Sequence, residues 1–288
     1  MSETQASCGR LGDTADRDYS GKLRLFAALA EPELRAAIAS LALASGMRVL
    51  DAGCGTGETL GWLAAAVAPG GLVVGADLSA THLTAARGSS PQALLLQADL
   101  GRIPLLSHSF DLVWSVNTIH HLHDPVAGAR ALAALLRPGG RLVLGQSSLL
   151  PEMYFAWDAR LERVTTEAVR AYYRDRYRLS EHDLTAVRGL FALLQATGLG
   201  RISVRTLMIE RVAPLDPAAH AWLLEAIFRG TWGERLRPYL SAADYAELTR
   251  LCDPDHPEFA LRRPDFHFLQ TFTLALGERL SARSARGG

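Results

Sequence analysis

The chain has 288 residues, 49% of them hydrophobic, and its 30 basic and 30 acidic side chains leave no net formal charge. That length and apolar content predict one large domain, or one domain with a sizeable insertion, around a substantial core. The basic residues are scattered, which argues against a nucleic-acid partner, because phosphate backbones are held by basic stripes. The one lysine, Lys22, is expected to be a solvated surface charge.

The sequence predicts neither a secretory signal nor a membrane span. The amino terminus, MSETQASCGRLGDTADRD, lacks a basic segment followed by an apolar one, and no apolar stretch approaches ~18 residues. Cys8, Cys54 and Cys252 are odd in number, far apart and away from metal-type ligands, which favours reduced thiols. We therefore expect a cytoplasmic protein without disulfides, and its oligomeric state stays open.

Between Met47 and Ser148, leucine-rich or β-branched runs alternate with alanine-rich stretches, which is typical of a parallel sheet covered by helices on both faces. Five strands are expected there, in the segments MRVLDAG from Met47, LVVGAD from Leu72, ALLLQAD from Ala93, FDLVWSV from Phe110 and RLVLGQS from Arg141. One helix begins near Glu58. Another, over 126–136, is expected to stop at the sequence RPGG, where proline cannot continue a helix and glycine supplies a left-handed turn.

Helical segments are predicted to interrupt the rest of the sheet. The core continues with a helix over 185–196 and the strand RISVRTLMIERV from Arg201, and the last strand is FHFLQTFTLALG from Phe266. The expected parts are a helical lid over 1–45, a core over 46–150, a helical cap over 151–184, a core continuation over 185–213, a second helical insertion over 214–262, a final core strand over 263–279 and a disordered tail over 280–288. The sequence thus predicts an α/β fold, a seven-stranded doubly wound Rossmann-like sheet with a late hairpin-like pair and helical cap insertions.

The segment VLDAGCGTGETL places Asp51 at the end of the first strand and three glycines, Gly53, Gly55 and Gly57, in the turn that opens the next helix. Glycine lets the backbone turn tightly and lets a ligand approach closely, although a plain strand-to-helix connection would also explain such a turn. A dinucleotide fingerprint would have glycine where Glu58 stands. Acids on both sides of the glycines suit a ligand that brings a positive charge, such as the amino group of a methionine moiety.

Two further acids follow the next two strands. Asp77, beside Leu78, is placed to accept both hydroxyls of a ribose, and Asp99, beside Leu100, to accept from the exocyclic amine of an adenine. Each acid alone would more often be a solvated loop residue. Acids at three successive carboxyl ends of strands indicate a ligand site, because open parallel sheets bind their ligands at that edge.

From about Tyr19 to Ser148 the chain resembles the class I methyltransferases that use S-adenosylmethionine (SAM), in particular bacterial small-molecule enzymes of quinone and specialised-metabolite synthesis. VLDAGCGTGETL is similar to the first family motif, VVGADLS to the second, and QADLGRIPLLSHSFDLVWSVNTIHHLHDP to the third and fourth. The resemblance implies SAM as cofactor and S-adenosylhomocysteine (SAH) as its product. The cofactor contacts that it implies are Tyr19 in the lid, Asp51, Gly53, Gly55 and Gly57 at the methionine part, Asp77 at the ribose, Asp99 and Leu100 at the adenine, the backbone of Asn117 near the sulfonium, and Cys54, Leu78 and Thr118 nearby.

The sequence HHLHD puts His120, His121 and His123 next to Asp124. This spacing presents three ligands together on neither a helix face nor a strand face, so no metal site is expected. In the resembling family a similar histidine-bearing stretch faces the donor methyl, which implies a general-base or substrate-orienting role for His120 or His121. A histidine hydrogen-bonded within the cleft wall is the alternative. Tyr154 is a further candidate for a catalytic role.

Aromatic residues of the cap and the second insertion predict the character of the acceptor site. Aromatics at helical spacing are commonly core residues, but together they suggest an apolar, flat-sided pocket for a small, aromatic natural-product acceptor. The candidate pocket residues are Trp157, Tyr172, Tyr173, Arg176, Tyr177 and Trp232. The segment RRPDFHFLQTFTLALGE is also similar to actinobacterial enzymes that methylate indole carbon. Carbon, nitrogen and oxygen acceptors stay open, and so does the use of a general base.

Other functions compete with methyl transfer to a small molecule. A nucleic-acid methyltransferase acting on base amines would usually show Asn or Asp, two prolines and an aromatic residue where this chain has NTIH after the fourth strand. Glu58 in the loop disfavours an NAD-dependent oxidoreductase. A SAM-binding regulatory or partner protein without turnover stays open, because the motifs bind cofactor and none proves chemistry. The sequence therefore predicts a SAM-dependent methyltransferase with a small-molecule substrate and neither a nucleic-acid nor a membrane partner.

Overall fold

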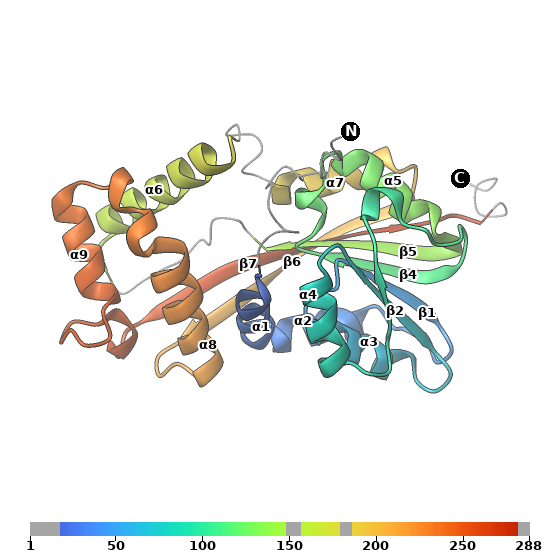
Figure 1. The fold of residues 1–288 in the computed structure, drawn as a ribbon, viewed down its shortest axis with the longest axis horizontal. Coiled ribbons are helices and arrows are strands. Elements are labelled where there is room, and N and C mark those ends of the chain that lie inside the picture. The colour runs from blue at the N-terminus through green and yellow to red at the C-terminus, as the bar shows by residue number, and fades with distance from the viewer. Residues whose placement is uncertain (1–17, 148–156, 179–185, 282–288) are drawn as a thin grey trace, which may run out of the picture.

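Seven strands form one mixed sheet in the order β3-β2-β1-β4-β5-β7-β6 (Figure 1). The computed structural model describes residues 18–147, 157–178 and 186–281. The first five strands run parallel, and β7 pairs antiparallel with both β5 and β6. The predicted α/β sheet with a late antiparallel pair is confirmed. The strand bounds are β1 Arg48–Ala52, β2 Leu72–Asp77, β3 Leu94–Gln97, β4 Phe110–Val116, β5 Leu136–Ser147, β6 Gly200–Val212 and β7 His267–Glu278.

Helices cover both faces of the parallel strands, which explains why those strands are almost continuously apolar. The helices α3 (Glu58–Val67) and α4 (Ala80–Ser89) lie on one face, and α5 (Pro125–Ala134) and α7 (Ala186–Ala196) on the other (Figure 1). In β4, between the two layers, every residue but Val116 is buried. Two apolar cores result, one on each face of the sheet.

One predicted boundary is wrong. α5 ends at Ala134 and β5 already begins at Leu136, so the RPGG sequence lies inside the strand and does not end the helix. The buried Leu136 pairs with Phe110, and the register shifts before Leu112 pairs with Arg141. Leu136 is therefore the first residue of the strand, and the helix ends before it reaches the RPGG sequence. The glycines of that sequence turn the chain within the strand.

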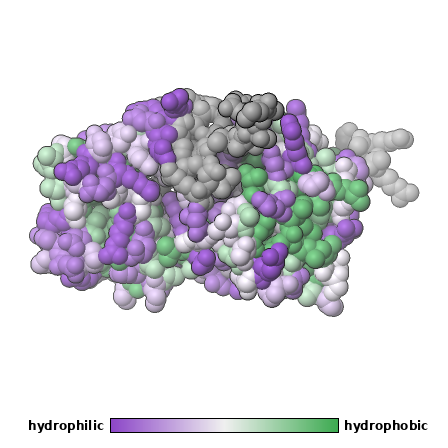
Figure 2. All heavy atoms as spheres, viewed as in Figure 1, coloured by the Kyte–Doolittle hydropathy of each residue, from purple (hydrophilic) through white to green (hydrophobic). Residues whose placement is uncertain are grey.

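Further helices lie beside the carboxyl ends of the parallel strands and around the far ends of the long strands β6 and β7 (Figure 1). They fall within the predicted lid, cap and second insertion, whose boundaries as units stay a prediction. Around α6 and α9 the visible face is largely hydrophilic (Figure 2). The bounds are α1 Ser20–Leu29, α2 Glu31–Ser40, α6 Ala159–Tyr177, α8 Pro217–Ala221, the π-helix η4 Trp222–Trp232 and α9 Ala242–Cys252, with short 3-10 turns at Leu100–Arg102, Ile119–His121, Gly233–Arg235, Arg237–Tyr239 and Ala260–Arg262.

Within the described ranges, no helix is both long enough and apolar enough to cross a bilayer. The predicted tail over 280–288 lies outside the described residues from 282 onward.

Candidate functional site

A cavity of about 850 Å³ opens at the carboxyl ends of the parallel strands. α1 and the π-helix η4 contribute to its wall, so segments far apart in the sequence enclose one space. Many of the predicted site residues meet there. They are Tyr19, Gly53, Gly55, Asp77, Leu78, Asp99, Leu100, Asn117, Thr118, His120, His121 and Tyr173.

The glycine loop after β1 follows a backbone path that other residues would strain. Gly53 has a φ of +85° and Gly57 a φ of +89°, both in the left-handed region that glycine adopts without steric cost. A Cβ atom at Gly53 would collide with the Thr118 side chain, and one at Gly57 with Ala86 of α4. The loop therefore packs tightly against its own chain, and Gly53 presents bare backbone to the cavity beside Thr118.

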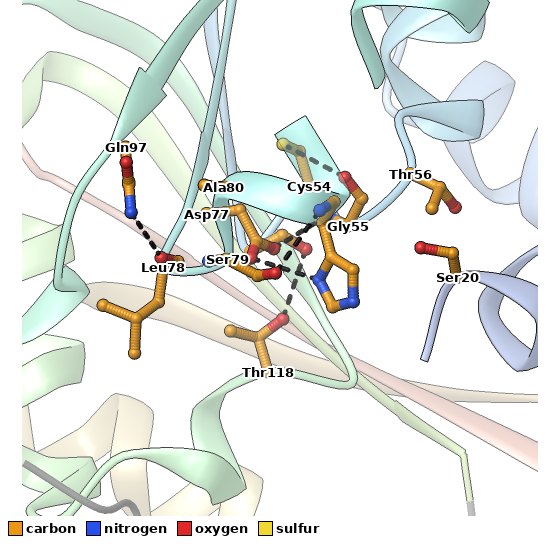
Figure 3. Close-up of polar contacts among 12 residues, drawn as sticks. Ser20, Cys54, Gly55, Thr56, Asp77, Leu78, Ser79, Ala80, Gln97 and Thr118 are labelled. Carbon is orange, nitrogen blue, oxygen red and sulfur yellow. Dashed lines mark hydrogen bonds and ion pairs between the residues drawn. The ribbon is translucent and has the colours of Figure 1, made fainter. Parts of the chain in front are cut away.

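Asp77, at the end of β2, ties this loop to the start of α4 (Figure 3). Its Oδ2 accepts a 2.9 Å hydrogen bond from the Gly55 amide, and its Oδ1 accepts one of 2.9 Å from the Ser79 amide. His82 Nδ1 lies 3.3 Å from the same Oδ1. The carboxylate lines the cavity and keeps lone pairs for further donors, an arrangement that suits the hydroxyls of a ribose.

Asp51 lies behind the loop and does not line the cavity. Its side chain is buried, and Oδ2 has no hydrogen-bond partner among the described residues. Burial, followed by the charges of Asp77 and Glu58, raises the pKa of Asp51 to about 8. An ammonium group brought by a ligand would offset this concentration of acids. The loop therefore fits a cofactor with a cationic methionine part, although direct contact with Asp51 stays a prediction.

Cys54 and Gly57 also lie behind the loop, outside the described cavity wall. Burial raises the pKa of the Cys54 thiol, and its Sγ is close to Gly75 of β2. These two residues shape the loop from the sheet side, and their implied role as cofactor contacts stays a prediction.

At the adenine end, Asp99 caps the turn Leu100–Arg102, because its Oδ1 accepts a 2.8 Å hydrogen bond from the Gly101 amide. Leu100 is buried and Leu78 is 39% exposed, and both line the cavity with Asp99. An apolar wall on either side of a carboxylate suits the flat face and the exocyclic amine of an adenine.

The His120 and His121 rings lie against each other in the turn Ile119–His121, with centroids 4.0 Å apart. Burial, followed by His121, lowers the pKa of His120 well below its usual value, and Gln146 of β5 opposes this shift. This shift favours the neutral form of His120 and makes its imidazole a weaker base than an exposed histidine. Among the described residues, no three histidine, cysteine or acidic side chains are grouped to hold a metal ion. Tyr154, the further catalytic candidate, lies outside the described residues.

Asn117 joins the ends of β4 and β5 beside the cavity. Its side-chain Oδ1 accepts hydrogen bonds from the Ser147 amide at 2.7 Å and from the Ser147 hydroxyl at 2.9 Å. Its own amide donates to the Gly145 carbonyl at 2.8 Å. The residue has a φ of +52°, which asparagine tolerates better than most residues. Asn117 therefore fixes the sheet edge where the sulfonium is expected.

We expect Asn117→Ala to lower the free energy of unfolding by about 2–4 kcal/mol, because it removes the bonds to Ser147 and strains a left-handed residue. Asn117→Gly removes the same bonds without that strain and should be about 1 kcal/mol less destabilising. Urea denaturation of the wild-type and variant chains measures both values. Equal losses for the two variants would show that backbone strain has no part in the effect.

The aromatic residues predicted for the pocket divide into two groups. Tyr173 lines the cavity, and the described wall includes neither the other four aromatic residues nor Arg176. Trp232 is buried and stacked on Phe228, with centroids 5.4 Å apart, and Trp157 lies 5.8 Å from Trp232. These contacts make Trp157 and Trp232 part of the core between the helical segments.

Tyr172 meets Tyr173 and Tyr239 edge to face, with centroids 5.6 and 6.3 Å apart, outside the cavity wall. Arg176 is exposed near the end of α6. The side chain of Tyr177 lies outside the described set. Helical spacing could not distinguish the face of α6 that meets the cavity from the face that packs on other helices.

Lys22 is exposed, as expected for a solvated charge. The sequence did not show that this exposed side chain lines the cavity. Sequence reasoning also missed other wall residues. Some lie on α4 and at the end of β5, next to the predicted cofactor edge, and the others lie on α1, η4 and β7, which tertiary packing brings to the site. The one available signal was that Lys22 is unique in the chain. The missed residues include Leu23, Phe26, His82, Gln146, Ser147, Trp222, Ile227, Thr231 and Gln270.

Comparison with known proteins identifies the family. Residues 50–144 match the family model described as "Methyltransferase domain". The chain is 30% identical over 232 residues to trans-aconitate 2-methyltransferase of Deinococcus radiodurans, covering 80% of this chain and 84% of that protein. It is also 36% identical over 117 residues to 27-O-demethylrifamycin SV methyltransferase of Amycolatopsis mediterranei, covering 38% of this chain and 42% of that protein.

The first curated relatives are matched over only part of their length, with the chain spanning 36%, 39% and 42% of them. The crystal structure of the YcgJ protein from Bacillus subtilis is similar in fold, with a TM-score of 0.53 and 17% identity over 88% of this chain and 100% of that one. Together with the cofactor motifs in one cavity, these likenesses show that the chain belongs to the class I SAM-dependent methyltransferases.

Proposed function

We propose that the protein transfers the methyl group of SAM to a small molecule bound in the same cavity. The observation that carries this proposal is that one space of about 850 Å³ adjoins both the glycine loop with its acids and a wall of helices outside the parallel core. Ligand pockets commonly measure about 300–1,000 Å³. The volume therefore suits a nucleoside cofactor together with a small acceptor.

The wall away from the glycine loop supports an acceptor with a flat apolar body. Phe26 of α1, Tyr173 of α6 and Trp222 of η4 line this part, and the Phe26 and Trp222 rings meet edge to face at 5.4 Å. We propose an aromatic natural product as the acceptor, with an indole as the first compound to test. The two relatives described above are named for trans-aconitate and for a demethylrifamycin, so proteins similar to this chain differ in acceptor.

Bound SAM supplies an activated methyl group, so the protein needs chiefly to hold the acceptor in line and exclude water. The bare backbone at Gly53 and the loop after β4 would hold the methionine part, and Asp77 the ribose. His120 and His121 lie on the same loop and can take up a proton that the acceptor loses. These are the roles that we assign to residues of the chain.

Two measurements test this function. Calorimetry with SAH and with NAD should show binding of SAH and no binding of NAD. Incubation with methyl-labelled SAM and a panel of indoles and phenols should then yield a labelled product. Binding of NAD without SAH would support the oxidoreductase alternative, and binding of SAH without a labelled product from any compound would support a SAM-binding partner protein without turnover.

We expect His121→Ala to slow a single turnover by about 100-fold or more when the acceptor must lose a proton, because a positioned base contributes that much. Rapid-quench measurement at saturating SAM and acceptor isolates the transfer step from binding. His120→Ala, which changes the adjoining ring, is the matched comparison. If both variants react at the wild-type rate, neither histidine takes part in the mechanism.

A further inference from the structure

The cavity wall contains a cation that lies on α1, away from the strand ends. Lys22 is the only lysine among the 288 residues. It lies on α1 with Leu23 and Phe26, and Tyr19 precedes the first residue of that helix; all four line the cavity. Residues at i, i+3, i+4 and i+7 share one face of a helix. Leu23 and Phe26 give this face an apolar surface, and Lys22 adds a positive charge to the same wall of the cavity.

The π-helix η4 carries the hydrogen-bond partner of Lys22, the hydroxyl of Thr231. Its hydrogen bonds run from residue i to i+5, which widens the turn and brings Trp222, Ile227 and Thr231 to the cavity. The Thr231 hydroxyl donates to the Ala226 carbonyl, five residues earlier, at 2.9 Å. It accepts a 3.4 Å hydrogen bond from Lys22 Nζ. α1 and η4 thus hold the ammonium group in a defined place.

The surroundings of the ammonium group lack a counter-charge. Desolvation by the surrounding protein atoms, followed by the charge of Arg235, lowers the pKa of Lys22 to about 8, although the residue is exposed. Most Lys22 side chains are then still protonated at pH 7. An ammonium group has three donors, and within the described ranges Thr231 accepts the one hydrogen bond that Lys22 makes. No carboxylate of the described residues forms an ion pair with it.

Lys22 is exposed in the cavity wall and forms no ion pair with a described residue, so its ammonium group can pair with an anion that enters the cavity. We propose that Lys22 binds a carboxylate group on the methyl acceptor, at the Thr231 side of the cavity. This inference rests on the proposed function and narrows the acceptor to an aromatic acid. The carboxylate replaces the missing counter-charge, while Phe26 and Trp222 hold the apolar body.

The experiment compares two probes that differ only in charge, indole-3-acetate and indole-3-acetamide, by calorimetry on the SAH-loaded full chain. We expect the acetate to bind at least tenfold more tightly. Lys22→Met should bring acetate affinity down to that of the amide, and Lys22→Arg should restore part of the preference. Arg24→Met removes an exposed charge from the same helix and should leave the preference intact.

A lysine labelled with carbon-13 at Cε gives a single side-chain NMR signal in this chain, because it has no other lysine. That signal should shift with the acetate and not with the amide. Equal affinities in the wild type, or a preference that survives Lys22→Met, would overturn the inference. So would a Lys22→Met variant that loses affinity for SAM but not for decarboxylated SAM, since the charge would then serve the cofactor. Failure of the wild type to bind SAH, measured first, would defeat the proposed function instead.

Discussion

Asp77→Ala should lower the affinity for SAH by at least about 100-fold. The substitution removes a carboxylate that lines the cavity and also holds the Gly55 and Ser79 amides. Hydrogen bonds to a charged group contribute about 1.5–3 kcal/mol each, so the loss of the bonds to two ribose hydroxyls alone costs about 3–6 kcal/mol, which is at least about 100-fold in affinity. Calorimetric titration with SAH at constant salt measures this loss.

Two variants separate the ribose contact from the support of the loop. Asp77→Asn keeps one side-chain acceptor for the backbone amides and should lose affinity by an intermediate amount. His82→Ala removes the neighbour at 3.3 Å and one side chain of the cavity wall, but it keeps the carboxylate, and should cost less than about tenfold. An affinity for SAH within threefold of wild type in Asp77→Ala would contradict the ribose assignment.

The parallel core and its cofactor edge could be predicted from the sequence because local patterns encode them. Strands buried on both faces leave continuous apolar runs, and β4 is such a run. Since the carboxyl ends of parallel strands meet at one edge, the acids at 77 and 99 could be placed together without a structure. The structure brings both to the cavity with Gly53.

The opposite wall could not be predicted, because tertiary packing decides it. No local motif shows that α1 faces η4, or that η4 is a π-helix that brings Thr231 to the cavity. If the same segment were α-helical, its side chains would point in other directions. The place of the exposed Lys22 in the cavity wall was consequently missed. Trp232 was assigned to a pocket, although it is stacked on Phe228.

Asp51→Asn should stabilise the SAH-free protein, most strongly at alkaline pH. In the folded chain the pKa of Asp51 is raised from 3.8 to about 8, so between these values the folded chain holds a proton that the unfolded chain has lost. Stability therefore falls as pH rises from about 4 to about 8. One pKa unit corresponds to about 1.4 kcal/mol, which makes the full effect several kcal/mol. Asparagine does not ionise and escapes this penalty.

Urea denaturation at pH 5 and pH 8 measures this gain, which should be several times larger at pH 8. Asp255→Asn, at an exposed position, is the control and should change the free energy of unfolding little at either pH. A pH-independent effect of Asp51→Asn would mean that the buried carboxyl does not titrate between these values.

The same substitution should weaken SAH binding by about 10–100-fold, although it stabilises the fold. An ammonium group near Asp51 favours the ionised carboxylate, so wild-type binding at pH 7 should release a proton from Asp51. Titrations in buffers of different ionisation enthalpy count the released protons, and Asp51→Asn should release fewer. An unchanged proton count would show that the ligand's charge does not act on Asp51, which does not line the cavity. If Asp51→Asn raises the free energy of unfolding of the SAH-free protein and lowers its affinity for SAH, the acids around the loop favour cofactor binding and destabilise the protein without cofactor.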